Sequence, residues 1–324
     1  MTLRQAFAGD PLARVTPPSM GRSDDFGAFS IGPENSPGED AEIVEGNAFD
    51  VFDVPFTDQT GFTHFMDGAE RKWRVGFYGL HPIYLAHVSA GLLKREERTV
   101  LPPEEGRYST GRLECFAPET AVAAATLAGL KCTPIKLEEG STSAMVETQI
   151  RDAVQHAREH HEVNLAATFE NGEGWLLIDG GIGWPLRVNA RLAHAVGIVK
   201  THSRQYVRSG ASVNKLLNMR AGQRSALFRR PNDSRQGNEA LSCYLKLRES
   251  SDQGPFYGLV RLEIPDLDEA KGRIDEIAGW VLAERTPLSL PDPRHDRLLY
   301  PIRLVETYLK ALQPSPAAVL GFLG

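Results

Sequence analysis

Two short apolar runs along the chain each end in the dipeptide Asp-Gly. The first reads Phe62-Thr-His-Phe-Met-Asp67-Gly68, and the second reads Trp175-Leu-Leu-Ile-Asp179-Gly180. Such runs predict strands, and the β-rich run from Arg71 to Tyr78 predicts a hairpin whose turn lies at Asp67-Gly68. Asp-Gly is also common in turns for its backbone geometry alone. Two such strands would nevertheless bring two carboxylates to one edge of a sheet.

Periodic apolar positions predict the remaining elements. Ser141-Thr-Ser143, followed by apolar residues near a 3.6-residue period, predicts a capped long helix that ends at Asn171-Gly172. Three strands are expected over residues 58–93, and a helical insertion over 94–140 that contains an alanine-rich helix at 120–130. Further along the chain we expect strands at 195–200, 242–247 and 257–263, and helices at 266–284 and 300–312.

These elements predict an α/β protein with a mixed β-sheet flanked by helices. Residues 1–57 are acidic and rich in Pro and Gly, and are predicted to form an N-terminal arm beside one domain over 58–324. No apolar run approaches the roughly 18 to 20 residues that span a bilayer, and the first residues lack an apolar signal segment. We therefore expect a cytoplasmic protein that does not bind a membrane.

The cysteines give no sign of a disulfide framework. Cys115, Cys132 and Cys243 are widely spaced and odd in number, and they form no CxxC motif. Reduced, buried thiols are the expected state.

The charge is distributed unevenly. The whole chain carries a net charge of -6, yet residues 200–248 contain eleven basic and two acidic residues. A local basic excess in an acidic protein indicates a phosphate-binding surface, and hence a nucleic acid. A solvated arginine-rich face or a subunit contact is the alternative.

The predicted long helix also carries an HxxEH motif. In His156-Ala-Arg-Glu159-His160 the histidines are one helical turn apart and could ligate zinc, with the glutamate as general base. A peptidase of this type needs a third ligand, and Glu239 and Glu249 do not lie in a convincing helical frame. A zinc peptidase is therefore less favoured than a solvated helix face.

The order of the motifs resembles the NurA nuclease family. The first motifs are three strands, which end in Asp67-Gly, Asp179-Gly and Lys200, and a long helix that bears a glutamate before Asp179. The later motifs are the pair Tyr244-Leu-Lys-Leu and Val260-Arg-Leu-Glu263, and the closing Tyr300-Pro-Ile-Arg-Leu304. The resemblance runs from about residue 60 to the C-terminus. It implies an RNase H-like fold and a nuclease dependent on Mn²⁺ or Mg²⁺. It also implies a homodimer that processes DNA ends with a HerA-type hexameric ATPase, in repair or in antiviral defence.

The resemblance suggests roles for particular residues. Asp67, Glu162 and Asp179 would hold the metal ions, with Glu147 as the alternative to Glu162. Lys200 would meet the scissile phosphate, unless it is a solvated lysine at a strand end. The basic region would follow the DNA backbone through Arg204, Arg208, Lys215, Arg229 and Arg230.

The closing helix departs from the family pattern, because Tyr308 stands where a histidine is expected. Tyrosine is a poor metal ligand near neutral pH, since its ordinary pKa is about 10. Either His295 or Glu306 takes that place, or the metal site is weakened, or activity is lost. The alternative function is accordingly a catalytically weak relative that serves as a DNA-binding adaptor ring for the ATPase.

Overall fold

A single mixed β-sheet runs through the protein. The computed structural model describes residues 1–20, 41–97, 99–102, 108–122, 126, 128–169, 174–188, 192–201, 206–231, 240–249, 254, 256–286 and 299–324. The main strand order is β2-β12-β13-β14-β10-β9-β4-β5-β7-β8, with β1, β3, β6 and β11 paired beside it. The strands β4, β9 and β10 are mutually parallel, whereas β4 and β5, and β10 and β14, are antiparallel. The predicted α/β class with a mixed sheet is thus confirmed.

The strands are β1 (Ala13–Met20), β2 (Glu42–Ile43), β3 (Val51–Asp53), β4 (Phe62–Tyr78), β5 (His81–Glu96), β6 (Thr99–Leu101), β7 (Ser109–Pro118), β8 (Lys131–Ile135), β9 (Trp175–Asp179), β10 (Ala195–Val199), β11 (Gln223–Ser225), β12 (Phe228–Arg229), β13 (Ala240–Lys246) and β14 (Leu259–Pro265). The helices are α1 (Leu3–Ala6), the 3₁₀ turn η1 (Glu119–Ala121), α3 (Ser143–Ala166), α4 (Gly183–Val188), α5 (Gly210–Leu217), α6 (Asp268–Gly272), α7 (Ile274–Ala283), α8 (Tyr300–Leu312) and α9 (Pro316–Leu323).

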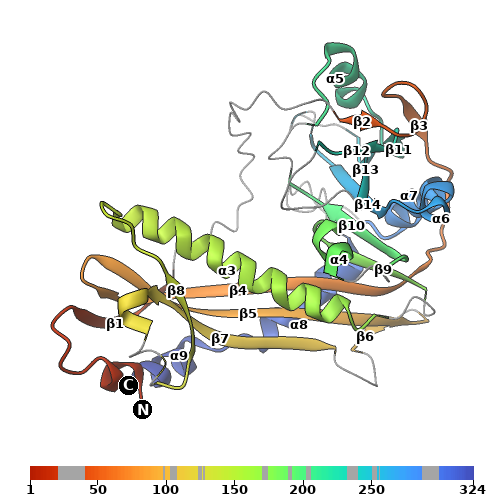
Figure 1. Cartoon of the computed structure of the whole chain (residues 1–324). Helices are drawn as coiled ribbons and strands as arrows, with labels where there is room; N and C mark the ends of the chain where they lie inside the picture. The colour runs from red at the N-terminus through yellow and green to blue at the C-terminus, as the bar shows by residue number, and fades with distance from the viewer. Residues whose placement is uncertain are drawn as a thin grey trace.

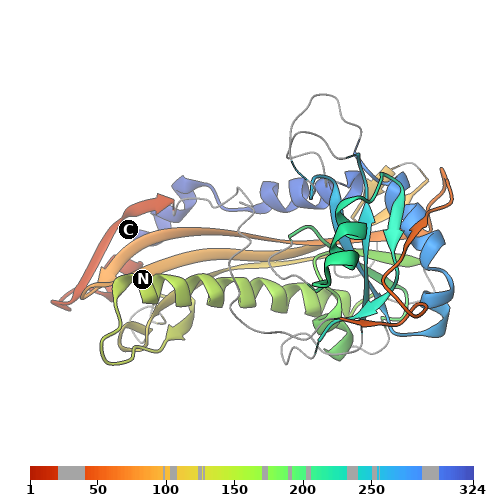
Figure 2. The ribbon, with the colours of Figure 1, turned by 90° about the horizontal axis from the view of Figure 1, so that it is seen from above.

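Helices cover both faces of the long strands. Figures 1 and 2 show α3 lying along one face of β4 and β5, and α8 along the other. The side chains of β4 alternate between these faces, as a strand requires. Phe65 packs in the core beneath α8, and Met66 packs in the core beneath the C-terminal part of α3. None of the described helices is both long and apolar enough to cross a bilayer.

The long helix was predicted well. Thr142 caps α3, because its side chain accepts a hydrogen bond from the backbone N–H of Met145. The buried residues Val146, Ile150 and Val154 follow one another at four-residue spacing and pack on the sheet. The helix ends at Ala166, and the expected stop at Asn171-Gly172 lies outside the described residues.

The prediction of a turn at Asp67-Gly68 is wrong. β4 continues through both residues to Tyr78, and the hairpin reverses at Gly79 and Leu80. Two long strands therefore replace the three expected over 58–93. Gly68 lies inside a strand because α3 packs closely against it: a Cβ at Gly68 would overlap the carboxylate of Glu162.

The predicted helical insertion over 94–140 is wrong except near the expected alanine-rich helix, where Val122 and Thr126 are helical among the described residues. Its described residues include β6, β7 and β8, of which β7 pairs with β5 and extends the sheet. Cys115 on β7 and Cys132 on β8 stand opposite each other as free thiols, and Cys243 is buried. Alternating polar and apolar residues on β7, such as Arg112, Leu113 and Glu114, were the signal for a strand.

The described parts of the predicted N-terminal arm take part in the domain. β1 pairs with β4, and β3 pairs with β11. The guanidinium of Arg4 donates to the carbonyl of Gly324 at 2.6 Å, so the two ends of the chain lie together (Figure 1). The segment 41–53 also supplies acidic residues that pair with basic residues of the later region, among them Asp50 with Lys215.

Candidate functional site

Asp67 and Asp179 lie at matching positions on neighbouring parallel strands. Met66 pairs with Ile178, so the aspartates follow one residue later on β4 and at the end of β9. Asp67 is only 7% exposed, and its Oδ1 accepts the backbone N–H of Gly68 at 2.7 Å. Burial, and after it the nearby charge of Asp179, raises the pKa of Asp67 well above its ordinary value. The predicted meeting of two carboxylates is therefore present in the fold.

Lys200 completes this arrangement from the next strand. It directly follows β10, where Ile198 pairs with Asp179. Its Nζ donates to Asp179 Oδ2 at 2.7 Å, and both side chains are about one quarter exposed or less. Burial alone would lower the pKa of Lys200, but Asp179 and Asp67 together raise it. Lys200 is thus a largely buried cation paired with Asp179, and not a solvated strand-end lysine.

Glu162 approaches the same part of β4 from α3. Its carboxylate accepts a hydrogen bond from Arg158, whose Nε lies 3.6 Å from an oxygen of Glu70. Burial raises the pKa of Glu162 to about 7, although Arg158 opposes the shift. This carboxyl group is thus poised to exchange a proton near neutral pH.

Glu147 lies elsewhere on the same helix. Fifteen residues separate it from Glu162, which is roughly 22 Å along an α-helix. Its carboxylate accepts a hydrogen bond from the hydroxyl of Tyr84. Of the two glutamates considered from the sequence, the structure places Glu162 near Asp67.

The three carboxylates reach β4 from two faces of the sheet. Because successive strand residues point to opposite faces, Asp67 points away from the side on which Glu162 overlies Gly68. Gly91, the cross-strand partner of Asp67, faces α8: a Cβ there would lie 3.0 Å from Leu309 and 3.4 Å from Val305. Among the described residues, no three His, Cys, Asp or Glu side chains converge closely enough to hold one metal ion.

The fit to a divalent cation is therefore partial. The oxygen donors of Asp67 and Asp179 have the right chemistry for Mg²⁺ or Mn²⁺, and their mutual repulsion would be relieved by a cation. Glu162 does not join them in one coordination sphere, at least among the residues that the structure describes. The structure supports a two-carboxylate pair more directly than the expected set of three.

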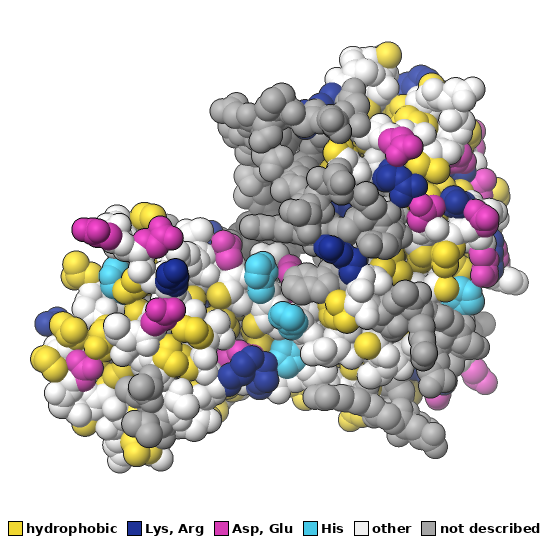
Figure 3. Space-filling view, in the orientation of Figure 1, with side chains coloured by type: hydrophobic (Ala, Val, Ile, Leu, Met, Phe, Trp, Pro, Cys, Tyr) yellow, Lys and Arg dark blue, Asp and Glu magenta, His cyan; other side chains and the backbone are white. Residues whose placement is uncertain are grey.

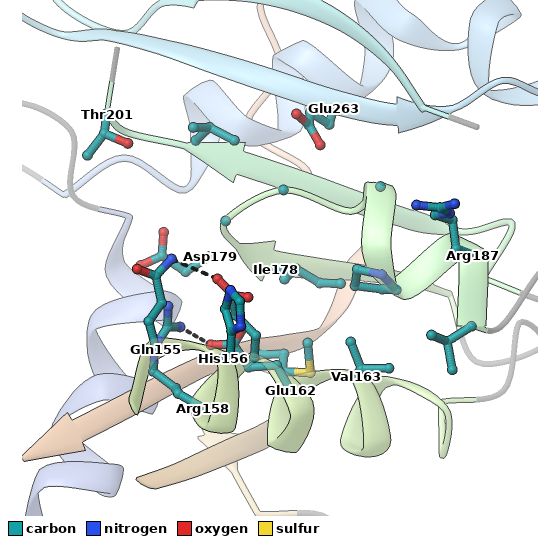
Figure 4. Close-up of a pocket in the computed structure, with 18 of the residues that line it drawn as sticks. Gln155, His156, Arg158, Glu162, Val163, Ile178, Asp179, Arg187, Thr201 and Glu263 are labelled. Atoms are coloured by element: carbon teal, nitrogen blue, oxygen red, sulfur yellow. Dashed lines mark hydrogen bonds and ion pairs between the residues drawn. The ribbon is translucent and has the colours of Figure 1, made fainter. Parts of the chain in front are cut away.

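A cavity of about 840 Å³ opens beside these residues. Figure 4 shows its two walls: Gln155, His156 and Glu162 of α3 on one side, and Thr201 and Glu263 on the other, with Asp179 between them at one end. The sequence did not single out Arg158, Arg261 or Glu263 as lining residues. The signal for Arg261 and Glu263 was their spacing of two residues within an otherwise apolar strand, β14, which puts both side chains on one face.

The HxxEH motif contributes to the same cavity. Histidine side chains group over the C-terminal half of α3 in the space-filling view (Figure 3). His156 and Glu159 line the cavity, and Gln155 donates to Glu159 at 2.8 Å. The described residues offer no third protein ligand for a zinc ion at this motif. Glu249 instead accepts the backbone N–H of Ala221 at 3.1 Å, and Glu239 lies outside the described residues.

The basic region is largely neutralised by remote acids. Lys215 pairs with Asp50, Arg229 with Asp266 at 2.7 Å, and Arg230 with Glu263 at 3.2 Å. Arg208 is exposed, and Arg204 lies outside the described residues. Arg224, which is 2% exposed, holds both oxygens of Glu45 at 2.7 and 2.8 Å. Counting charges within residues 200–248 therefore overstated the free positive charge of this region, because the acids that neutralise it lie outside that range, in 42–53 and 263–275.

Tyr308 and its neighbours on α8 do not reach this cavity. The ring of Tyr308 lies 6.4 Å from that of Tyr108, and Tyr308 packs against the main core. Glu306 accepts a hydrogen bond from Lys310 at 2.6 Å, and His295 lies outside the described residues. Glu306 is nevertheless close enough to Lys200 to contribute to the raised pKa of that lysine.

No model of a known protein family matches the chain, and a search of curated proteins finds no relative.

Proposed function

We propose that this protein is a deoxyribonuclease that depends on Mn²⁺ or Mg²⁺. The observation that carries the proposal is the placement of Asp67 and Asp179 side by side on parallel strands, with Lys200 bonded to Asp179. Ligands in α/β sheets bind outside the carboxyl ends of the strands, and β9 and β10 both end here. The order of motifs that resembles the NurA family includes these same three residues and agrees with the proposal.

The roles of the residues follow from their chemistry. A divalent cation bound by Asp67 and Asp179 would lower the pKa of a water molecule and stabilise charge on a phosphodiester. Lys200 holds Asp179 in place and supplies positive charge where a phosphate would dock. Glu162 lies in the adjoining cavity with a pKa near 7, which suits a group that passes a proton to or from the reacting atoms.

The proposal extends to partners. In keeping with the resemblance, we propose that the protein acts on DNA ends as a homodimer with a HerA-type hexameric ATPase. An RNase H-like order of strands belongs to the same proposal. It is supported by a mixed sheet in which an acid-bearing hairpin lies next to a second acid-bearing strand.

The test is cleavage of end-labelled linear DNA with Mn²⁺, Mg²⁺, Zn²⁺ or EDTA, with and without the ATPase. We expect Mn²⁺-dependent degradation by the wild type and none by Asp179→Asn. Asp152→Asn is the matched control, because Asp152 is an exposed carboxylate on α3 that lines no part of the cavity. Equal activity in all three proteins, or no cleavage under any condition, would contradict the nuclease assignment.

Two observations favour a second function. Because the described carboxylates do not converge on one metal ion, and Tyr308 replaces the expected histidine, the alternative is a DNA-binding adaptor for the ATPase. This function predicts DNA binding and ATPase binding that survive Asp67→Ala, together with the absence of metal-dependent cleavage.

A further inference from the structure

Arg261 is a buried arginine on the cavity wall opposite α3. It lies on β14 and pairs with Val199, the last residue of β10, so it neighbours Lys200 along the strand end. The residue is 6% exposed and lines the cavity. Burying a guanidinium is costly unless its charge and its donors are satisfied.

The contacts of Arg261 orient its guanidinium but leave one of its donors without an acceptor among the described residues. One terminal nitrogen donates to Glu263 Oε1 at 2.9 Å, and the guanidinium carbon lies 4.8 Å from the ring centre of Tyr206. The Nε atom is buried and has no hydrogen-bond partner among the described residues. Glu263 is meanwhile shared, since it also accepts the backbone N–H of Ile182 at 2.9 Å and faces Arg230.

The cavity carries charges of both signs. On the α3 wall Glu159 and Glu162 lie with Arg158, and Asp179 lies between the two walls at one end. On the other wall Arg261 lies beside Glu263, and its guanidinium has the fork geometry that suits phosphate. Tyr206, which also lines the cavity, offers an aromatic ring of the kind on which nucleic-acid bases stack.

We propose that Arg261 binds a backbone phosphate of the nucleic-acid substrate within this cavity. The inference rests on the proposed function and names the residue that positions the strand. β14 and β9 are two strand spacings apart, on the order of 10 Å, with β10 between them. Arg261 therefore takes a phosphate neighbouring the one that reacts beside Asp179. Tyr206 and Glu263 keep the guanidinium oriented for it.

The test measures binding separately from cleavage. A fluorescein-labelled single-stranded oligonucleotide is titrated with full-length protein in EDTA at several salt concentrations. We expect Arg261→Gln to weaken binding roughly tenfold or more, as loss of a charge-assisted hydrogen bond does. The slope of log affinity against log salt should also fall by about 0.7, which is the loss of one phosphate contact.

Two further variants make the result decisive. Arg14→Gln removes the same charge from an exposed site on β1 and should bind like the wild type. Arg261→Lys keeps the charge without the fork, so it should keep the salt slope and bind with intermediate affinity. If Arg261→Gln fails to fold, the test rests on Arg261→Lys, and an oligonucleotide affinity equal to that of the wild type in this variant overturns the proposal. Wild-type affinity in a folded Arg261→Gln protein overturns it as well.

The outcome is independent of whether the protein is a nuclease. Binding that depends on Arg261 in a protein that never cleaves DNA would uphold this site and reject the catalytic function. Cleavage abolished by Asp179→Asn, with binding indifferent to Arg261, would do the reverse.

Discussion

Gly68 and Glu162 are packed so closely that only a hydrogen atom fits between the strand and the helix. A Cβ at Gly68 would overlap the Glu162 carboxylate and lie 3.0 Å from Cγ of Arg158. This contact places Glu162 one residue from Asp67 along β4, yet on the other face of the strand. The glycine therefore sets the distance between α3 and the acidic strand.

We first predict the energetic coupling of this pair. Gly68→Ala should cost about 1–3 kcal/mol, because the added methyl displaces Glu162 and strains the packing of Arg158. In a Glu162→Ala background the same substitution should cost clearly less, since the overlapping carboxylate is gone and only the tight contact with Cγ of Arg158 remains. Urea unfolding of the four proteins measures the cycle. Gly210→Ala, where a Cβ meets nothing within 4 Å, is the control. Equal costs in both backgrounds would contradict the contact.

The second prediction separates the two glutamates of α3. Glu162→Gln should lower the rate of metal-dependent DNA cleavage by roughly 100-fold or more, as expected for loss of a positioned proton-transfer group. Glu147→Gln, the matched change about 22 Å away along the helix, should leave the rate within a factor of two or so. Single-turnover cleavage rates distinguish them. A large effect at Glu147 with none at Glu162 would reverse the assignment.

The two strands that carry Asp67 and Asp179 were predictable because each depends on a local pattern, an apolar run that ends in an acid. Their parallel pairing, which brings the two aspartates together, is a long-range contact. The amphipathic period of α3 was equally local, with Val146, Ile150 and Val154 on its buried face. Such signals depend on residues a few positions apart.

The features that were missed depend on partners far along the chain. The Asp67-Gly68 dipeptide is typical of a turn, and only the close approach of Glu162 on α3, 94 residues after Gly68, explains a glycine inside a strand here. The split of the carboxylates between two faces follows from the same contact. Likewise, Arg224 looked like free charge until Glu45, 179 residues earlier, was found to neutralise it.

The third prediction uses that remote pair. Glu45→Ala should destabilise the protein by about 1–3 kcal/mol, since it leaves the buried guanidinium of Arg224 with Asp275 as its remaining carboxylate partner and removes the acceptor for the N–H of Leu227. Glu42→Ala is the matched control: Glu42 is 72% exposed and lies 3.4 Å from Arg229, so its loss should cost less than about 1 kcal/mol. Denaturant midpoints measure both. Similar small losses would mean that residues 41–53 contribute little to the fold.

The last prediction concerns pH and a buried histidine on the face of β5 that points away from α3, since the neighbouring residues Ala86 and Val88 are the ones that pack against that helix. His87 on β5 is 9% exposed, and its Nδ1 is buried without a hydrogen-bond partner among the described residues. Burial lowers the pKa of His87 below its ordinary value of 6.5, so the folded protein holds this imidazole neutral where the unfolded chain would protonate it.

A lowered pKa in the folded state fixes the sign of the effect. The unfolded chain binds more protons below pH 6.5, so the contribution of His87 is fully present above that pH and is lost progressively as the pH falls toward the lowered pKa. The raised pKa values of Glu162 and Asp67 act in the opposite direction over the same range, so the difference between wild type and His87→Leu is the quantity that isolates His87. In urea unfolding between pH 7.5 and pH 5, the midpoint of the wild type should fall relative to that of His87→Leu on the acidic side of about 6.5. A difference between the two midpoints that stays constant over this range, or that changes in favour of the wild type toward low pH, would contradict a lowered pKa for His87.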